Sequence, residues 1–105
     1  MAFDVIIRGG TVVDGTGAAP LKADIGITGE RITAIGDIPK SASESTKTID
    51  ATGLHISPGF IDVHSHADVA LLNDGQHAQG IRQGVTPEII SPDGLSLAPL
   101  SAVNY

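Results

Sequence analysis

The sequence predicts an α/β protein in which a small all-β module precedes a strand–helix–strand unit. Thirteen glycines and six prolines cut its 105 residues into short segments, which favours short strands over long helices. Apolar and polar residues alternate in the first half, whereas after Pro58 two apolar runs flank a stretch with helical character. We therefore divide the chain into residues 1–57 and residues 58–105.

The all-β module begins with two predicted strands, residues 3–9 and 11–14, which Gly9 and Gly10 separate. Residues 14–20 contain two glycines and end in proline, so they are expected to form a loop.

A hairpin is predicted next, from residues 23–28 and 31–36 with Gly29 in the connection. Each segment alternates in polarity. In the second segment, this alternation places Ile32 on the face opposite Ile35.

A polar stretch, residues 39–47, lacks apolar periodicity and is expected to be an exposed loop. Residues 48–50 and 54–57 flank a glycine-containing turn, and we expect two more short strands from them. His55 lies in the second of these, and we interpret it as a half-buried strand residue rather than a ligand.

The second half has a different pattern. Residues 59–66 and about 85–91 are predicted to be strands, with a helix over roughly 74–83 between them. Strand, helix and strand in this order imply a parallel pair with a right-handed crossover. His77 lies in the predicted helix and is expected to be exposed to solvent.

Two histidines stand at the end of the first of these strands. His64 and His66 are two residues apart, so both project from the same face, about 6.6 Å apart at the backbone. Imidazoles at this spacing can bind one metal ion. Asp62 is predicted on the same face, with Ile61 and Val63 packed on the other. The alternative is a chance pair at a solvated strand end.

Asp93 follows the second strand. Active sites of parallel α/β proteins collect at the carboxyl ends of the strands, so Asp93 can approach an ion held by the two histidines. The alternative interpretation is an ordinary Asp-Gly turn, because Gly94 comes next. Both remain open on the residues alone.

Composition excludes several classes of partner. The chain has 6 basic and 12 acidic residues and a net charge of −6, which disfavours nucleic acid and anionic membranes. It has no cysteine, hence no disulfide or thiolate metal site. No run approaches the ~18 apolar residues of a membrane span, and the first residues do not resemble a signal peptide. A soluble, cytoplasmic protein is expected.

Taken together, these segments resemble the metal-dependent amidohydrolase superfamily. That resemblance implies a small β-sandwich followed by the first strands of a (β/α)₈ TIM-type barrel, which is incomplete in this chain. The matching runs are residues 4–15, 29–36, 49–53 and 58–66, the last with the histidine pair.

Within the superfamily the sequence most resembles N-acyl-D-amino-acid deacylases (D-aminoacylases). The matching features are residues 14–17, Asp68, residues 82–86 and residues 91–96. The family often has a cysteine where Asp93 stands, and a carboxylate shifts metal preference toward harder ions. It usually has threonine in place of Pro87. Because proline cannot donate to a sheet ladder, pairing is expected to begin only at Glu88.

The resemblance implies hydrolysis of the amide bond of N-acyl-D-amino acids by a metal-activated water. It implies one or two divalent ions, expected to be Zn²⁺, with His64, His66 and Asp93 as ligands. Asp62 is expected to orient a histidine, and Asp68 to contact substrate or solvate a loop. The general base is expected beyond the last residue.

A (β/α)₈ barrel takes typically ~250 residues, so we expect this chain to be the N-terminal part of a larger enzyme. The rest of the barrel would lie in the same or another chain, and exposed sheet edges favour self-association. Two alternatives remain: a cyclic-amide hydrolase of the hydantoinase or dihydroorotase kind, and a non-catalytic structural or assembly chain.

Overall fold

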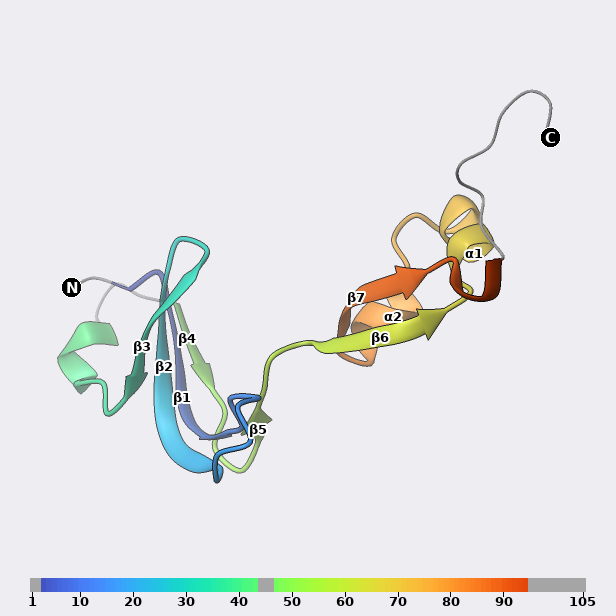
Figure 1. The fold of residues 1–105 in the computed structure, drawn as a ribbon. Coiled ribbons are helices and arrows are strands. Elements are labelled where there is room, and N and C mark those ends of the chain that lie inside the picture. Colours follow the sequence, from blue (N-terminus) through green and yellow to red (C-terminus); the bar gives the residue numbers. More distant parts are fainter. Residues whose placement is uncertain (1–2, 44–46, 95–105) are drawn as a thin grey trace. The chain divides into compact units, whose positions relative to one another are not determined.

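The computed structural model describes residues 3–43 and 47–94 and falls into two units, Met1–Pro58 and Gly59–Tyr105 (Figure 1). This division lies one residue after the boundary that the sequence suggested. Residues 95–105 of the predicted second part lie outside the described residues. Strands dominate and the helices are short, in keeping with a mostly β member of the α/β class. Of the helices in the described part, none has the length and apolarity to cross a bilayer.

Unit 1 is built on one five-stranded sheet. Its strand order is β3-β2-β1-β4, and β5 also pairs with β1. The first three strands are antiparallel, whereas β4 and β5 run parallel to β1. The strands are β1 (Val5–Val12), β2 (Leu21–Thr28), β3 (Arg31–Gly36), β4 (Lys47–Asp50) and β5 (His55–Ile56).

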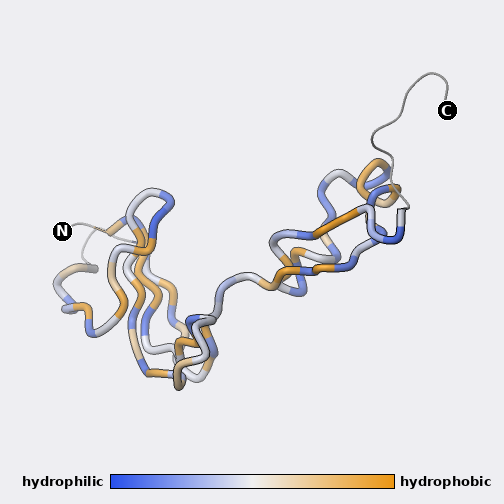
Figure 2. Tube along the Cα trace, in the orientation of Figure 1, coloured by the Kyte–Doolittle hydropathy of each residue, from blue (hydrophilic) through white to orange (hydrophobic). Residues whose placement is uncertain are grey.

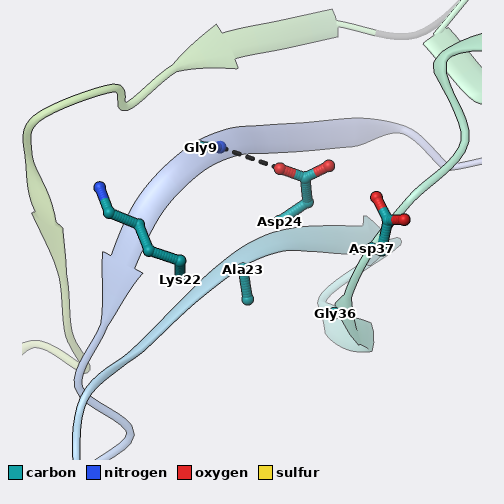
Figure 3. A pocket seen from close by; sticks show the side chains of 6 residues that line it. All are labelled: Gly9, Lys22, Ala23, Asp24, Gly36 and Asp37. Atoms are coloured by element: carbon teal, nitrogen blue, oxygen red, sulfur yellow. Dashed lines mark hydrogen bonds between the residues drawn. The ribbon is translucent and has the colours of Figure 1, made fainter.

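The two glycines near the start do not separate two strands, as the sequence suggested, but form a bulge within β1. Ile7 pairs with Ile25 and Gly10 with Ala23, so β1 carries one extra residue. Gly9 has φ 70° and donates its N–H to Asp24 Oδ1 at 2.9 Å (Figure 3). A bulge keeps the strand continuous because the extra residue is accommodated by a local kink.

The predicted hairpin of β2 and β3 is confirmed, but its face pattern is not a simple alternation. Gly26 pairs with Ala34 and Ile27 with Ile32, which makes Thr33 an extra residue on β3. As a result, Ile32 and Ile35 line the same hollow, of about 270 Å³. The predicted placement of these two on opposite faces was therefore wrong, because the bulge shifts the register by one.

Val12, Ala23 and Ile25 form one buried cluster in unit 1, with Ile7, Ile27 and Ile56 packed against it. Three further apolar residues of this unit are buried: Ile6, Ile38 and Ala51. Figure 2 shows the hydrophobic residues distributed along these strands. Ile32 and Ile35 remain 61% and 50% exposed. The apolar face of the sheet is thus only partly covered within the described residues.

The polar stretch at 39–47 is not entirely a loop. It contains the short 3-10 helix η1 (Lys40–Ser43), and Lys47 already belongs to β4. Residues 44–46 lie outside the described part. Arg8 reaches this region, donating to the carbonyl oxygens of Ile38 and Pro39 and binding Asp24 Oδ2 at 2.6 Å.

Unit 2 contains the predicted parallel strand pair, β6 (Phe60–Ser65) and β7 (Val85–Ile90). The helix predicted at 74–83 is wrong in its bounds. Two short helices, α1 (Asp68–Asn73) and α2 (Ala78–Arg82), occupy the connection instead. Asp74 separates them, because its Oδ1 accepts the N–H of Gln76 at 3.1 Å and so offers the backbone an alternative to the helix.

The pairing of β6 with β7 is irregular in two places. Phe60 pairs with Val85, Asp62 with Glu88 and Ser65 with Ile90. Pairing thus begins at Val85 rather than at Glu88, the predicted start. Proline is tolerated because β7 carries one extra residue between Val85 and Glu88. A second extra residue on β6 restores the register before the strand ends.

Within residues 59–94, the apolar side chains of unit 2 do not form the packed interior that the sequence suggested. Ile61 and Val63 are 62% and 69% exposed, and Phe60 and Ile89 are 61% and 56% exposed. Two strands and two short helices offer too little surface to cover them.

Candidate metal centre

The two histidines and Asp93 converge at the carboxyl ends of β6 and β7. His64 lies in β6 and His66 one residue after it, while Asp93 lies in the 3-10 turn η2 (Pro92–Gly94) that follows β7. One ligand atom from each of the three residues lies within 4.8 Å of the other two. The convergence follows from the parallel pairing, which brings the ends of neighbouring strands together.

The distances among these side chains suit one cation. His64 Nε2 and His66 Nε2 lie 3.2 Å and 3.7 Å from Asp93 Oδ2, and the two imidazole centroids are 5.3 Å apart. Ligand atoms about 2.05 Å from a tetrahedral Zn²⁺ would lie about 3.3 Å from one another. Two imidazoles and a carboxylate are also a donor set that zinc uses in catalytic sites. The residues therefore fit the ion.

All three side chains are accessible. His64, His66 and Asp93 are 58%, 49% and 64% exposed. A catalytic metal needs at least one position open to water or substrate, and this arrangement leaves room for further ligands.

The backbone that carries Asp93 is unusual. Ser91 and Asp93 have φ 69° and 58°, the left-handed region that non-glycine residues seldom occupy. Ser91 Oγ donates to Asp68 Oδ2 at 3.1 Å, which ties the turn to the first residue of α1. Left-handed residues persist where the surroundings hold them, often at functional sites.

Asp62 and Asp68 lie beside the metal group rather than within it. Asp62 Oδ1 accepts the backbone N–H of His64 at 3.1 Å. Asp68 is half-buried, and its Oδ1 is buried with no hydrogen-bond partner among the described residues. The roles predicted for these two carboxylates therefore stay predictions.

The alternation that placed Asp62 beside His64 is interrupted by the extra residue on β6. Asp62 and Ser65 are half-buried, whereas Val63 and His64 are exposed. A bulge moves the side chains that follow it by one position relative to the partner strand.

The two remaining histidines differ from expectation. His55 is exposed on β5 rather than half-buried. His77 is not exposed: its side chain is 25% accessible, and its Nε2 is in hydrogen-bond contact with Glu88 Oε1. Glu88 also accepts a hydrogen bond from Ser65 Oγ at 2.7 Å.

Sequence reasoning missed this second polar cluster of Ser65, His77 and Glu88. A signal was present in β7, where Glu88 precedes two isoleucines in a strand expected to be apolar. A carboxylate on a strand that is expected to be buried needs partners, because burying it alone is costly. Its partners could not be identified before the register of the strand was known.

Comparisons with known proteins find relatives in sequence and in solved structures. No protein-family model matches the chain. A D-aminoacylase from Alcaligenes xylosoxydans xylosoxydans is 42% identical over 102 residues, which is 97% of this chain and 21% of that protein.

Solved structures extend the comparison to the fold. A D-aminoacylase with a binuclear metal centre superposes at TM-score 0.84 with 48% identity, over 97% of this chain and 21% of that chain. The N-acyl-D-glutamate deacylase of Bordetella bronchiseptica, complexed with zinc and a phosphonate inhibitor, superposes at TM-score 0.81 with 36% identity. That match covers 94% of this chain and 20% of the deacylase. A D-hydantoinase from Bacillus sp. AR9 superposes at TM-score 0.52 with 47% identity, but the match covers only 61% of this chain and 13% of the hydantoinase.

The resemblance that the sequence motifs indicated is confirmed by these matches. The chain spans about a fifth of the length of the relatives it matches. Over nearly its whole length, the chain is similar in sequence and in fold to the N-terminal portion of amidohydrolases of the D-aminoacylase kind.

Proposed function

We propose that this chain forms the N-terminal part of a metal-dependent amidohydrolase that hydrolyses the amide bond of N-acyl-D-amino acids. The observation that carries the proposal is the convergence of His64, His66 and Asp93 at two neighbouring strand ends. It is supported by the similarity of almost the whole chain to a D-aminoacylase and to a zinc-bound N-acyl-D-glutamate deacylase.

One or two divalent ions, with Zn²⁺ as the expected metal, would be held by His64, His66 and Asp93. When bound, such an ion lowers the pKa of a coordinated water toward about 7 and polarises the scissile carbonyl. Asp62 would fix the backbone at His64, and Asp68 would hold the Asp93 turn through Ser91. The general base would be supplied from outside the described residues.

The exposed apolar surfaces favour a larger enzyme. We assign the apolar face of unit 1 to one layer of a β-sandwich, since Ile32 and Ile35 are at least half exposed. Likewise, β6 and β7 would be the first strands of a (β/α)₈ barrel, whose other strands would cover Ile61 and Val63. The rest of the barrel would come from the same or another chain.

The direct test uses this chain together with the rest of the proposed barrel, whether in the same or another chain. His66→Ala should lose zinc and reduce hydrolysis of N-acyl-D-amino acids by more than about 100-fold, since even partners of metal ligands contribute 10- to 100-fold. His55→Ala is the matched control, because His55 is exposed on β5; it should retain the zinc content and turnover of the wild type. Wild-type zinc and turnover in His66→Ala would defeat the proposal.

A cyclic-amide hydrolase is the second candidate, favoured by the match to a D-hydantoinase. That match covers only 61% of this chain, against 97% for the D-aminoacylase. Assaying this chain together with the rest of the proposed barrel on N-acetyl-D-amino acids and on 5-substituted hydantoins separates the two. Faster hydrolysis of hydantoins would replace the first proposal by the second. Zinc binding without either activity would favour a structural chain.

A further inference from the structure

A second polar cluster shares the end of β6 with the two candidate histidine ligands. Ser65 stands between His64 and His66 in the chain. Its Oγ donates to Glu88 Oε2 at 2.7 Å and accepts the backbone N–H of Ala67 at 3.2 Å. The hydroxyl therefore bridges the end of β6 to β7 and also holds the residue that follows His66.

Glu88 uses both of its carboxylate oxygens. Oε2 accepts the Ser65 hydroxyl, and Oε1 contacts His77 Nε2. The side chains of Glu88 and His77 are only 14% and 25% exposed. A carboxylate with so little access to water is stabilised when its partners replace the lost hydration, and here two side chains from different elements do so.

The backbone around the pair is shaped to admit it. His77, the residue before α2, has φ 44° and ψ 43°, a left-handed conformation that costs a non-glycine residue free energy. Gly80 in α2 provides the space. A Cβ at Gly80 would lie 2.8 Å from His77 Nε2 and 3.0 Å from Glu88 Oε1, too close for either atom to stay in place.

We propose that Glu88 is a positioning residue for the metal site, acting through a clamp formed by Ser65, Glu88 and His77. This inference rests on the proposed metal-binding function. The clamp fixes the end of β6, and with it the backbone of both histidines, against β7, which leads into the Asp93 turn. Ligands held in place before the ion arrives bind it more tightly, because less conformational freedom is lost on binding.

The test measures Co²⁺ binding by the 105-residue chain, with visible absorption reporting both affinity and coordination. His66→Ala shows which signal arises at the candidate site. Ser65→Ala and Glu88→Gln should each weaken that binding by about 10- to 100-fold and alter the absorption band. Glu30→Gln is the matched control, because Glu30 is exposed in the β2–β3 turn, and it should bind Co²⁺ as the wild type does.

Three further variants distinguish positioning from general damage. Ser65→Thr keeps the hydroxyl and should restore most of the affinity lost in Ser65→Ala. The double variant of Ser65→Ala with Glu88→Gln should lose less binding free energy than the two single variants summed, since both changes weaken the same Ser65–Glu88 contact. Gly80→Ala should weaken Co²⁺ binding although alanine favours a helix.

A metal-free measurement guards against variants that fold poorly. Amide hydrogen exchange at Ala67 should quicken in Ser65→Ala and in Glu88→Gln, while exchange in β1 stays unchanged. Variants that keep wild-type Ala67 protection and Co²⁺ affinity would overturn the clamp and leave the hydrolase proposal standing. A wild-type chain whose Co²⁺ binding is unaffected by His66→Ala would overturn both.

Discussion

Two aspartates show how single side chains shape the loops of unit 1. Asp14 accepts the backbone N–H of Thr16 at 2.9 Å and its hydroxyl at 2.7 Å, and Asp50 accepts the N–H of Thr52 at 2.9 Å. These hydrogen bonds hold the pKa of each carboxyl below its ordinary value of 3.8. At Asp14 the backbone N–H of Thr16 is the main cause of the lowered pKa, whereas at Asp50 it is the side chain of Thr52.

This difference predicts an unequal response to the loss of a hydroxyl. Thr52→Val should remove the main cause of the lowered Asp50 pKa, whereas Thr16→Val should leave the main cause of the lowered Asp14 pKa, the Thr16 N–H, in place. Carboxyl ¹³C titration of both variants measures this. Because each folded pKa lies below the unfolded value, both turns are stabilised above pH 3.8 and lose this contribution as the pH falls through the folded pKa. An Asp14 pKa that returns to its ordinary value in Thr16→Val would contradict the assignment.

The side chain at residue 93 also determines which metal ions the candidate site prefers. A carboxylate is a harder ligand than a thiolate, and Asp93 is exposed enough to be exchanged without repacking. Asp93→Cys should raise the ratio of Cd²⁺ to Mn²⁺ affinity by at least about tenfold, measured by competition titration. Asp74→Cys, at an exposed aspartate outside the metal group, should leave the ratio unchanged if residue 93 binds the ion.

Bulges decide the geometry of the strands. The extra residues near Gly9, Thr33 and Pro87 each shift a register by one position. The bulge at Thr33 places Ile32 and Ile35 on the same hollow, and the bulge near Pro87 lets β7 accommodate proline. Gly10 shows how tightly such a site is built, because a Cβ there would lie 2.3 Å from Ile56 Cδ1 and 2.7 Å from Ile56 Cγ1.

Gly10→Ala should therefore destabilise unit 1 by about 1–3 kcal/mol, the usual cost of overpacking. Urea unfolding followed by circular dichroism measures it. The double variant with Ile56→Ala should lose less free energy of unfolding than the two single variants summed, since the second change removes the clash. Gly75→Ala, where the nearest atom to the new Cβ is 3.9 Å away, should stay within about 0.5 kcal/mol. Strict additivity would rule out the steric explanation.

At the level of the whole molecule, exposed apolar surface is the main feature. The sheet of unit 1 leaves Ile32 and Ile35 accessible, and β6 and β7 leave most of their large apolar side chains accessible. Contiguous apolar surface of this kind marks sites that another element covers. It is consistent with a chain that spans about a fifth of its relatives.

The 105-residue chain should therefore bind the dye ANS while retaining its native circular dichroism. Ile32→Thr with Ile35→Thr should lower that fluorescence, because threonine keeps β propensity but removes apolar surface. Glu30→Gln, in the neighbouring turn, should leave it unchanged. Fluorescence unaffected by the isoleucine changes would mean that the dye binds elsewhere.

Much of the fold followed from local patterns. The glycine-containing connection and alternating isoleucines predicted the β2–β3 hairpin, and the two apolar runs after Pro58 predicted the parallel pair of β6 and β7. The two-residue spacing of His64 and His66 likewise indicated the metal group with Asp93. Patterns of this kind are visible in sequence because they repeat with the period of the strand.

The failures have a common cause. A bulge leaves no periodic trace, so the continuity of β1 and the shared face of Ile32 and Ile35 were missed. The helix predicted at 74–83 overlooked the turn at Asp74, where a side chain competes with the backbone. His77 was expected in solvent because its partner, Glu88, is 11 residues away.

The sequence by itself determined which residues could bind a metal and which segments could pair, since both depend on spacing along one strand or across one turn. Only the tertiary structure decided the registers, and with them the contact between Ser65 and Glu88 and the pairing of His77 with Glu88. Registers depend on contacts between residues far apart in the chain, and a shift of one residue changes the neighbours of every side chain that follows.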